Sequence, residues 1–218
     1  MSDVVATPPA RRADRRRART RAALIDAAKE LIVEGAAATA TIQQITETAD
    51  VGFGSFYNHF ASKDELFHAA TAAVLEQWAQ LIEDAARHLS DPAERFAVSF
   101  RISARLAWTH PALAEVLDRF GLDLLDLSDG LGPRAVRDIA EGVQSGRFTV
   151  TNVPVALSVV GGSLLGFLRV RTSQPDLVSV DDVEALTHQL LVMLGVEPDE
   201  ATRLCRASLP GLESPETA

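Results

Sequence analysis

Apolar residues recur three and four positions apart along most of the chain, which is the spacing of amphipathic helices. Leu24, Ala28 and Ile32 show this spacing in the first such segment, residues 17–34. Two-residue alternation, the mark of a half-buried strand, is nowhere convincing, and residues 10–91 contain no proline. The pattern therefore predicts an all-α fold.

Capping residues indicate where the helices begin. Thr41 with Gln44, and Ser62 with Glu65, have the spacing of a capping box, in which the two side chains satisfy the first amide groups of a helix. The expected helices span residues 17–34, 41–48, 53–60, 62–89, 92–108, 111–120, 133–145, 153–171, 181–194 and 198–209, with a loop or irregular helix over 122–131.

The chain of 218 residues is long enough for a small domain joined to a larger one. We expect an N-terminal helix-turn-helix module over residues 15–61 and a larger helical body over 62–209. The long helix that begins after Ser62 joins them without a flexible linker. Residues 1–14 are expected to be a disordered basic arm, and residues 210–218 a disordered tail.

Residues 41–60 are predicted to form two short helices separated by the turn Asp50–Gly52. In a DNA-binding helix-turn-helix, the second helix lies in the major groove and points its N-terminal side chains at base edges. Those side chains here are Phe53, Gly54 and Ser55. Phe53 suits a thymine methyl group, Gly54 allows close backbone approach, and Ser55 can donate or accept a hydrogen bond.

Polar side chains suited to phosphate surround this second helix. We expect Tyr57, His59 and Lys63 to contact the DNA backbone, and Gln43 to reach a base or the backbone. Residues 51–63 include no carboxylate that would repel phosphate.

The other residues of the segment have expected structural roles. Phe56 and Phe60 are predicted to lie in the core of the small bundle, and Tyr57 to pack its ring with the hydroxyl outward. Asp50 is expected to adopt a bent or left-handed backbone, and Gly52 to begin the second helix without a side-chain cap.

Residues 20–66 resemble the DNA-binding domain of the TetR family of bacterial repressors. The similar segments are Leu31-Ile-Val-Glu-Gly35, Thr41-Ile-x-x-Ile45, Ala49-Asp-Val-Gly-x-Gly-Ser-x-Tyr57-x-His-Phe60 and Ser62-Lys-x-x-Leu66. The resemblance implies DNA contacts by the seven residues named above. It also implies a two-fold symmetric dimer on a palindromic operator, and a body whose ligand pocket controls DNA binding.

Two helices of the body are candidates for a dimer interface. Residues 153–171 are apolar nearly all round, and residues 181–194 have leucines at helical spacing. In TetR-like proteins the last two long helices form a four-helix bundle between subunits, which this pair resembles. The alternative is that both helices are ordinary core. The interface residues we expect are Gly162, Gly166, Leu186, Leu190 and Leu194.

A ligand pocket is implied by the family resemblance and not by residue spacing. The candidate lining residues are Trp78, Phe100, Arg105, Trp108 and Phe167. Their spacing does not distinguish a pocket wall from plain core. Arg105, on a mainly apolar helix, suits either an anionic ligand group or a salt bridge.

Charge is distributed unevenly along the chain. The net charge is −9, but residues 1–21 contain seven arginines against Asp3 and Asp14, a net of +5 that leaves −14 on the remainder. A basic arm on an acidic body is typical of an interaction tail, here for sequence-tolerant affinity to DNA. The alternative is a solvated tail without a partner.

Several classes of protein are disfavoured by composition. Cys205 is the single cysteine, so neither an intrachain disulfide nor a cysteine-based zinc site is expected, and the histidines show no metal-binding spacing. The N-terminus has no apolar stretch suited to a signal peptide, and the apolar run Val153–Leu168 falls short of about 20 residues for a membrane span. We therefore expect a soluble cytoplasmic protein with no cofactor.

Enzyme motifs are weak in this sequence. Gly52-Phe-Gly-Ser55 lacks the Lys-Ser/Thr ending of a phosphate-binding loop and is not a nucleophile elbow. The prediction is a homodimeric repressor, not an enzyme, released from DNA by a small molecule. Two alternatives stay open: a DNA-binding regulator without small-molecule input, and an enzyme or ligand carrier with a vestigial DNA-binding head.

Overall fold

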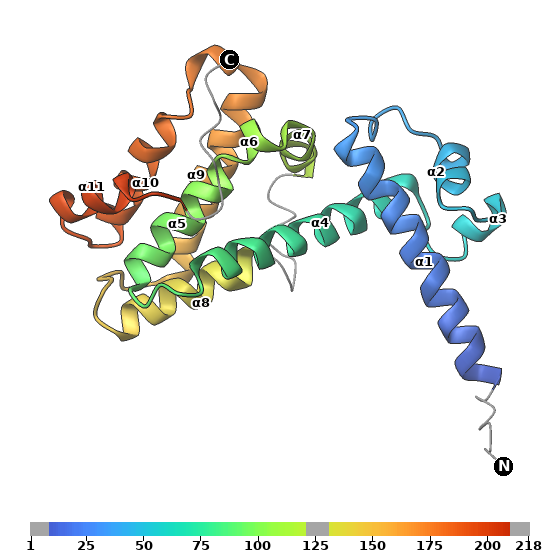
Figure 1. The fold of residues 1–218 in the computed structure, drawn as a ribbon, viewed down its shortest axis with the longest axis horizontal. Coiled ribbons are helices and arrows are strands. Elements are labelled where there is room, and N and C mark those ends of the chain that lie inside the picture. Colours follow the sequence, from blue (N-terminus) through green and yellow to red (C-terminus); the bar gives the residue numbers. More distant parts are fainter. Residues whose placement is uncertain (1–8, 121–130, 210–218) are drawn as a thin grey trace. The chain divides into compact units, whose positions relative to one another are not determined.

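The structure is a computed structural model that describes residues 9–120 and 131–209, and within these ranges every regular element is a helix (Figure 1). The all-α prediction is confirmed. Contacts divide the chain into two compact units, Met1–Ala73 and Val74–Ala218, and helix α4 contributes to both. The expected loop or irregular helix over 122–131 lies outside the described residues except for Leu131, which is helical, and the expected terminal disorder over 1–8 and 210–218 lies outside them too.

The first unit is a small bundle built on aromatic and aliphatic side chains. Phe56, Phe60, Leu24, Ile32 and Ile45 are almost completely buried, which confirms the core positions predicted for the two phenylalanines. Its helices are α1 (Pro9–Val33), α2 (Ile42–Thr48), α3 (Phe53–Phe56) and the first part of α4 (Lys63–Ala86). Because α3 is a single turn, packing rather than intrinsic helix propensity holds it in place.

Helix α1 begins at Pro9, eight residues before the predicted start at residue 17. Residues 9–14, expected to be disordered, are therefore helical. Alanine and arginine are strong helix formers, and proline is favoured at the first helical position. This part of α1 carries no apolar stripe, so hydrophobic periodicity cannot detect it.

Caps and turns in this unit follow the sequence closely. Thr41 and Gln44 form both reciprocal bonds of a capping box. Helix α2 ends in a Schellman motif, in which the Val51 N–H donates to the Thr46 carbonyl at 3.0 Å. The left-handed residue of that motif is Asp50, with φ of 51°, as predicted for the turn. Gly52 precedes α3 with an extended backbone and no side-chain cap.

The second unit is a helical bundle around α5. Nine of the 13 residues of α5 are buried, and α8, α9, α10 and α11 all pack against it. Aromatic and aliphatic side chains such as Phe96, Phe100, Leu191 and Leu194 make up the core. The elements are the second part of α4, α5 (Pro92–Ala104), α6 (Leu106–Thr109), α7 (Pro111–Phe120), α8 (Leu131–Gln144), α9 (Val153–Ser173), η2 (Pro175–Leu177), α10 (Asp182–Met193) and α11 (Pro198–Arg206).

Helix α9 is longer than the apolar run in its sequence. It continues through Ser173 for 21 residues, and by length and composition it is long and apolar enough to cross a membrane, so the expectation that it falls short was wrong. Two arginines, Arg169 and Arg171, extend the helix beyond the apolar run. A helix that packs within or between soluble subunits has the same composition.

Arg147, in the segment just after α8, forms ion pairs with residues of α11 and of the N-terminal cap of α5. Its guanidinium donates to Asp91, the N-cap residue of α5, at 2.8 and 3.1 Å, and to Glu200 of α11 at 3.1 and 2.8 Å. Burial alone would raise the pKa of Asp91, but hydrogen bonds from Arg147 and from the Ala93 N–H outweigh it, so the pKa lies below its usual value.

A carboxyl group whose pKa is lowered by folding stabilises the folded state at pH values above its unfolded-state pKa of about 4. This stabilisation is lost as pH falls through the lower folded-state pKa. We expect Arg147→Met to reduce the free energy of unfolding at pH 7 by about 1–2 kcal/mol. On acidification from about pH 5 to 3, the variant should also lose less stability than the unmodified protein does. Arg203→Met, which removes an exposed partner of Glu200, should cost about 0.5 kcal/mol or less. Urea unfolding as a function of pH measures both; equal behaviour of the two variants would contradict this role.

Candidate nucleic-acid interface and ligand cavity

Helix α3 has one buried and one exposed side. Phe56 packs inward, while Phe53 and Tyr57 are 53% and 57% exposed. Their rings meet edge to face with centroids 6.0 Å apart, and Tyr57 also contacts the ring of Phe56. Gly54 lies between them with open space around the position of a Cβ atom. Two exposed aromatic rings and a bare glycine thus form the outer surface of a one-turn helix.

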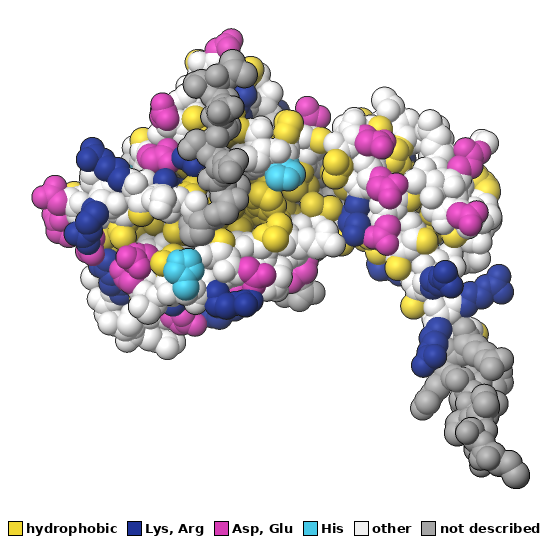
Figure 2. Space-filling view, in the orientation of Figure 1, with side chains coloured by type: hydrophobic (Ala, Val, Ile, Leu, Met, Phe, Trp, Pro, Cys, Tyr) yellow, Lys and Arg dark blue, Asp and Glu magenta, His cyan; other side chains and the backbone are white. Residues whose placement is uncertain are grey.

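A polar groove lies between α1 and the segment that ends α3. Arg16, Arg17 and Thr20 line it from α1, and Ser55 and His59 line it from the other side. The described lining residues include no carboxylate. Figure 2 shows Lys and Arg side chains grouped on the lower part of this unit, with acidic side chains elsewhere on its visible face.

Arg17 and Arg21, two arginines of α1 near this groove, contact the segment that follows α3. The Arg17 guanidinium donates to the Asn58 carbonyl at 3.5 Å, and the Arg21 guanidinium lies 5.0 Å from the centre of the Phe60 ring. Burial lowers the pKa of His59, and the charges of Arg17 and Arg21 lower it further. His59 is therefore more strongly biased to its neutral form than a free histidine.

Lys63 and Gln43 have partners within the protein. The Lys63 ammonium donates to the carbonyls of Ala38 and Ala40 at 3.2 and 2.9 Å, which secures the loop between α1 and α2. Gln43 is exposed and donates to Glu47 at 2.9 Å. The sequence did not predict the structural role of Lys63, because its partners are backbone carbonyls more than 20 positions away.

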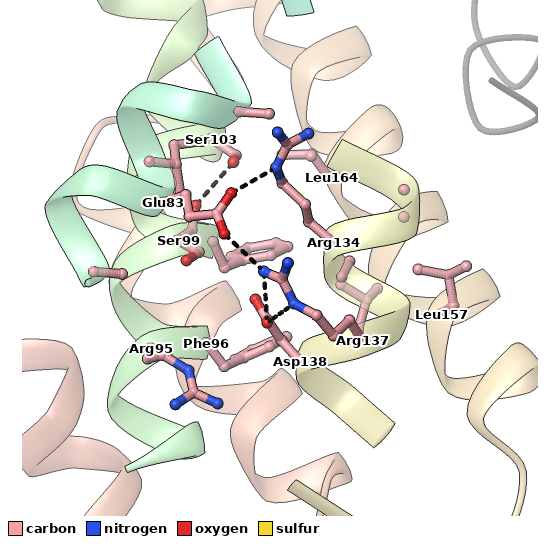
Figure 3. Close-up of a pocket in the computed structure, with 18 of the residues that line it drawn as sticks. Glu83, Arg95, Phe96, Ser99, Ser103, Arg134, Arg137, Asp138, Leu157 and Leu164 are labelled. Atoms are coloured by element: carbon pink, nitrogen blue, oxygen red, sulfur yellow. Dashed lines mark hydrogen bonds and ion pairs between the residues drawn. The ribbon is translucent and has the colours of Figure 1, made fainter. Parts of the chain in front are cut away.

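The second unit contains a cavity of about 590 Å³ between four helices. Helices α5 and α9 supply an apolar side, which includes Phe96, Phe100, Leu157 and Leu164. Figure 3 shows that charged residues also line the cavity, where Glu83 of α4 meets Arg134 and Arg137 of α8. The cavity therefore has one apolar side and one strongly polar side.

The polar side is a connected set of ion pairs. Arg134 donates to Glu83 at 3.0 Å and to both carboxylate oxygens of Glu76 at 2.8 and 2.7 Å. Arg137 lies 3.4 Å from Glu83 and 3.3 Å from Asp138. Glu83 thus joins two arginines of α8 to α4.

The carboxyl groups of Glu83 and Asp138 differ in the direction of their pKa shifts. The hydrogen bond from Arg134 lowers the pKa of Glu83, with Arg137 adding to the effect against the opposing burial. Burial raises the pKa of Asp138, and the nearby Arg137 only partly offsets this. Glu83 is thereby held as a carboxylate, whereas Asp138 is the more easily protonated acceptor of the cavity.

Of the five expected lining residues, Phe100 lines this cavity. The other four lie elsewhere: Trp78 packs against His110, Arg105 donates to Glu184 at 2.7 Å, and Trp108 contacts Phe167. Sequence reasoning missed the polar side. The signal for it was the spacing of Arg134, Arg137 and Asp138, which places three charged side chains on one helix face.

The expected interface residues fall into two groups. Gly162 and Gly166 are exposed on α9, with open space where a Cβ atom would lie. Leu186 is half-buried against the core of its own unit, and Leu190 and Leu194 are buried in it. Leu190 and Leu194 therefore offer little surface to a second subunit, because they are buried in the core of their own unit.

The fold and the exposed face of α3 define a DNA-binding regulator of the helix-turn-helix class, and comparisons with known proteins agree. Residues 24–70 match the family model of bacterial regulatory proteins of the tetR family, and residues 91–207, more than half of the chain, match the tetracyclin repressor-like C-terminal domain. The chain belongs to the TetR family. A search of curated proteins found no match.

Solved structures give the same assignment. RolR in complex with its ligand resorcinol is 30% identical over 92% of this chain and 100% of its own, with a TM-score of 0.73. RolR without ligand is 29% identical over 87% of this chain and 98% of its own, with a TM-score of 0.71. FadR from Bacillus subtilis in complex with stearoyl-CoA, at 21% identity and a TM-score of 0.57, covers 80% of this chain and 98% of its own and shares the fold.

The bonds of Lys63 predict a stability effect within the first unit. Lys63→Met removes a charged donor from two loop carbonyls, so the free energy of unfolding should fall by about 1–3 kcal/mol. Lys29→Met is the matched control, since the ion pair of Lys29 with Asp26 is local to α1, and it should cost about 0.5 kcal/mol or less. Chemical denaturation measures both; a Lys63 variant as stable as the Lys29 variant would contradict the role assigned to the loop bonds.

Proposed function

We propose that the protein is a cytoplasmic, homodimeric transcriptional repressor that binds a palindromic DNA operator and is released from it by a small molecule. The observation that carries the proposal is the exposed Phe53 and Tyr57 face of α3, which adjoins a groove lined by arginines. Such a surface combines apolar contact for base edges with positive charge for phosphates.

In this proposal the residues around α3 divide their roles. Phe53, Gly54 and Ser55 meet base edges. Tyr57 and His59 contact phosphate through a hydroxyl and a neutral imidazole. Lys63 has three N–H donors on its ammonium group, so it can keep its bonds to the loop carbonyls and still donate to a phosphate. Gln43 would give up its hydrogen bond to Glu47 and bond to a base or to the DNA backbone.

We propose that the helical N-terminal part of α1 provides the sequence-tolerant DNA affinity expected of the basic arm. Arg16 and Arg17 face the groove beside Ser55 and His59, and residues 13–19 are exposed. A phosphate bound in the groove would meet both guanidinium groups. Holding arginines on a helix reduces the entropy lost when DNA binds.

We propose that α9 supplies the centre of the dimer interface. Val155 and Val159 are 59% and 43% exposed, and together with Gly162 and Gly166 they form one stripe at helical spacing. Exposed apolar side chains beside glycines allow a second helix to pack closely. On α10, Val192 and Met193 are the exposed apolar residues that replace Leu190 and Leu194 in the interface we propose.

The cavity of the second unit is proposed as the effector site. RolR, the similar protein solved with resorcinol, supports a small hydroxylated aromatic ligand. Carboxylates such as Glu83 and Asp138 accept hydrogen bonds from hydroxyl groups, and Phe96 and Phe100 suit an aromatic ring. A ligand that competes for Glu83 changes how α4 is held, and α4 also begins beside the DNA-binding residues.

The groove predicts a change in the salt dependence of DNA binding. Replacing both Arg16 and Arg17 by alanine should lower the slope of log affinity against log salt by about two per subunit, with weaker binding to all duplexes. Arg203→Ala, on the exposed surface of α11, should leave the slope unchanged. Fluorescence anisotropy over a salt series measures this; an unaltered slope in the double variant would place the phosphate contacts elsewhere.

The cavity predicts a ligand response that depends on Asp138. With resorcinol as the probe, Asp138→Asn should weaken binding about tenfold, because a charged acceptor is lost from a half-buried site. Asp118→Asn, the same change in an ion pair outside the cavity, should bind as the unmodified protein does. Isothermal titration calorimetry compares them. Equal affinity in both variants would exclude Asp138 from the ligand site.

A further inference from the structure

The cavity of the second unit is much larger than a single aromatic ring requires. Its volume of about 590 Å³ is roughly four times that of an apolar cavity that holds benzene, about 150 Å³. Small side chains create this space, among them Ala79, Ala135, Gly161 and Ser99. A ligand that fills the cavity must therefore be larger than one ring, within the range of about 300–1,000 Å³ that is common for ligand sites.

Two phenylalanine rings give the apolar side its shape. Phe96 and Phe100 lie one turn apart on α5, with ring centroids 5.8 Å apart and planes inclined by 15°. Phe148 contacts Phe96 edge to face and holds that ring in place. Phe148 in turn sits over Gly142, where a Cβ atom would lie 2.1 Å from the ring. The two stacked rings, which are 6% and 5% exposed, form the aromatic part of the apolar lining of the cavity.

The charged residues of the cavity compensate one another. Arg134 bonds to Glu76 and Glu83, and Arg137 to Glu83 and Asp138. Of the other two arginines that line the cavity, Arg87 pairs with Asp84 and Arg95 with Glu141. A carboxylate or phosphate group on the ligand would have to displace one of these partners, whereas neutral hydroxyl groups can donate to the carboxylates as they stand.

We propose that the effector is a neutral, planar, two-ring aromatic compound with hydroxyl groups along one edge. This inference rests on the proposed function and names the ligand class of the same site. The hydroxyl groups donate to Glu83 and Asp138 and accept from Arg137. The two rings lie along Phe96 and Phe100, with Leu164 of α9 on the other side.

Three probes separate ring number from charge. Resorcinol has one ring with two hydroxyl groups, naphthalene-1,3-diol keeps the same hydroxyl pattern on two fused rings, and 3,5-dihydroxybenzoate keeps one ring and adds a carboxylate. Calorimetric titration of the full chain should give about tenfold tighter binding for naphthalene-1,3-diol than for resorcinol, because more apolar surface leaves water. The benzoate should bind more weakly than resorcinol.

Bulky substitutions test whether this preference arises in the cavity. Leu164→Trp fills the space of the second ring, so it should lower the affinity for naphthalene-1,3-diol more than that for resorcinol and thereby abolish the preference. Leu157→Trp, on the same helix, provides a second variant if the first unfolds. The matched control is Leu81→Trp, since Leu81 is 60% exposed on α4 and does not line the cavity. This variant should keep the full preference.

Resorcinol binding as tightly as naphthalene-1,3-diol, the benzoate binding most tightly, or an unchanged preference in both cavity variants would each overturn the inference. Absence of binding by all three probes would overturn it too. DNA binding by the unliganded protein, measured on the same samples, tests the proposed regulator separately. A protein that binds DNA and releases it with resorcinol, but shows no two-ring preference, would refute only the ligand class.

Discussion

The second unit is built around the buried helix α5, and the ion pairs of Arg134 connect α8 to α4 beside it. The Arg134 guanidinium on α8 is held by two carboxylates of α4, Glu76 and Glu83, which lie two helical turns apart on the same face. Exposed pairs of this kind contribute little singly, but here one half-buried arginine satisfies two acids at once. The arrangement fixes α8 against α4 and lines one side of the cavity with charge.

In the function proposed above, a single helix carries residues of both the proposed effector site and the proposed DNA-binding surface. Helix α4 begins at Lys63, whose ammonium secures the loop between α1 and α2, and it carries Glu83 into the cavity five turns later. A ligand that hydrogen-bonds to Glu83 alters the balance among its arginine partners. Differential binding of this kind is what a regulator requires, since a ligand shifts an equilibrium only by its unequal affinity for two states.

Local signals predicted the first unit well because its structure is set by neighbours in sequence. The capping box of Thr41 and Gln44, the left-handed Asp50 and the buried Phe56 all follow from residues within a few positions. The start of α1 was predicted eight residues late, because a helix of arginine and alanine has no apolar period to reveal it. The partners of Lys63 were missed for a related reason, since they lie in a distant loop.

The cavity was beyond local signals because its walls combine two helix pairs, α4 with α5 and α8 with α9, that are separated in sequence by α6 and α7. Phe96 has the pattern of a core residue, and Arg134 and Asp138 have the pattern of a solvated helix face. The cavity forms only where these side chains from different helices face one another across the bundle. Periodicity likewise did not separate core from interface: Leu190 and Leu194 have the spacing expected of an interface, yet they fill the core of their own unit.

The proposed function depends most directly on sequence-specific DNA binding by α3. Selection of duplexes from a random-sequence pool by the purified full chain, run beside its Phe53→Ala variant, measures this. We expect the unmodified protein to enrich a two-fold symmetric site and the variant to lose this enrichment while keeping salt-dependent affinity for duplex DNA. A pool that stays random with the unmodified protein, or an identical site enriched by both, would contradict the proposed function.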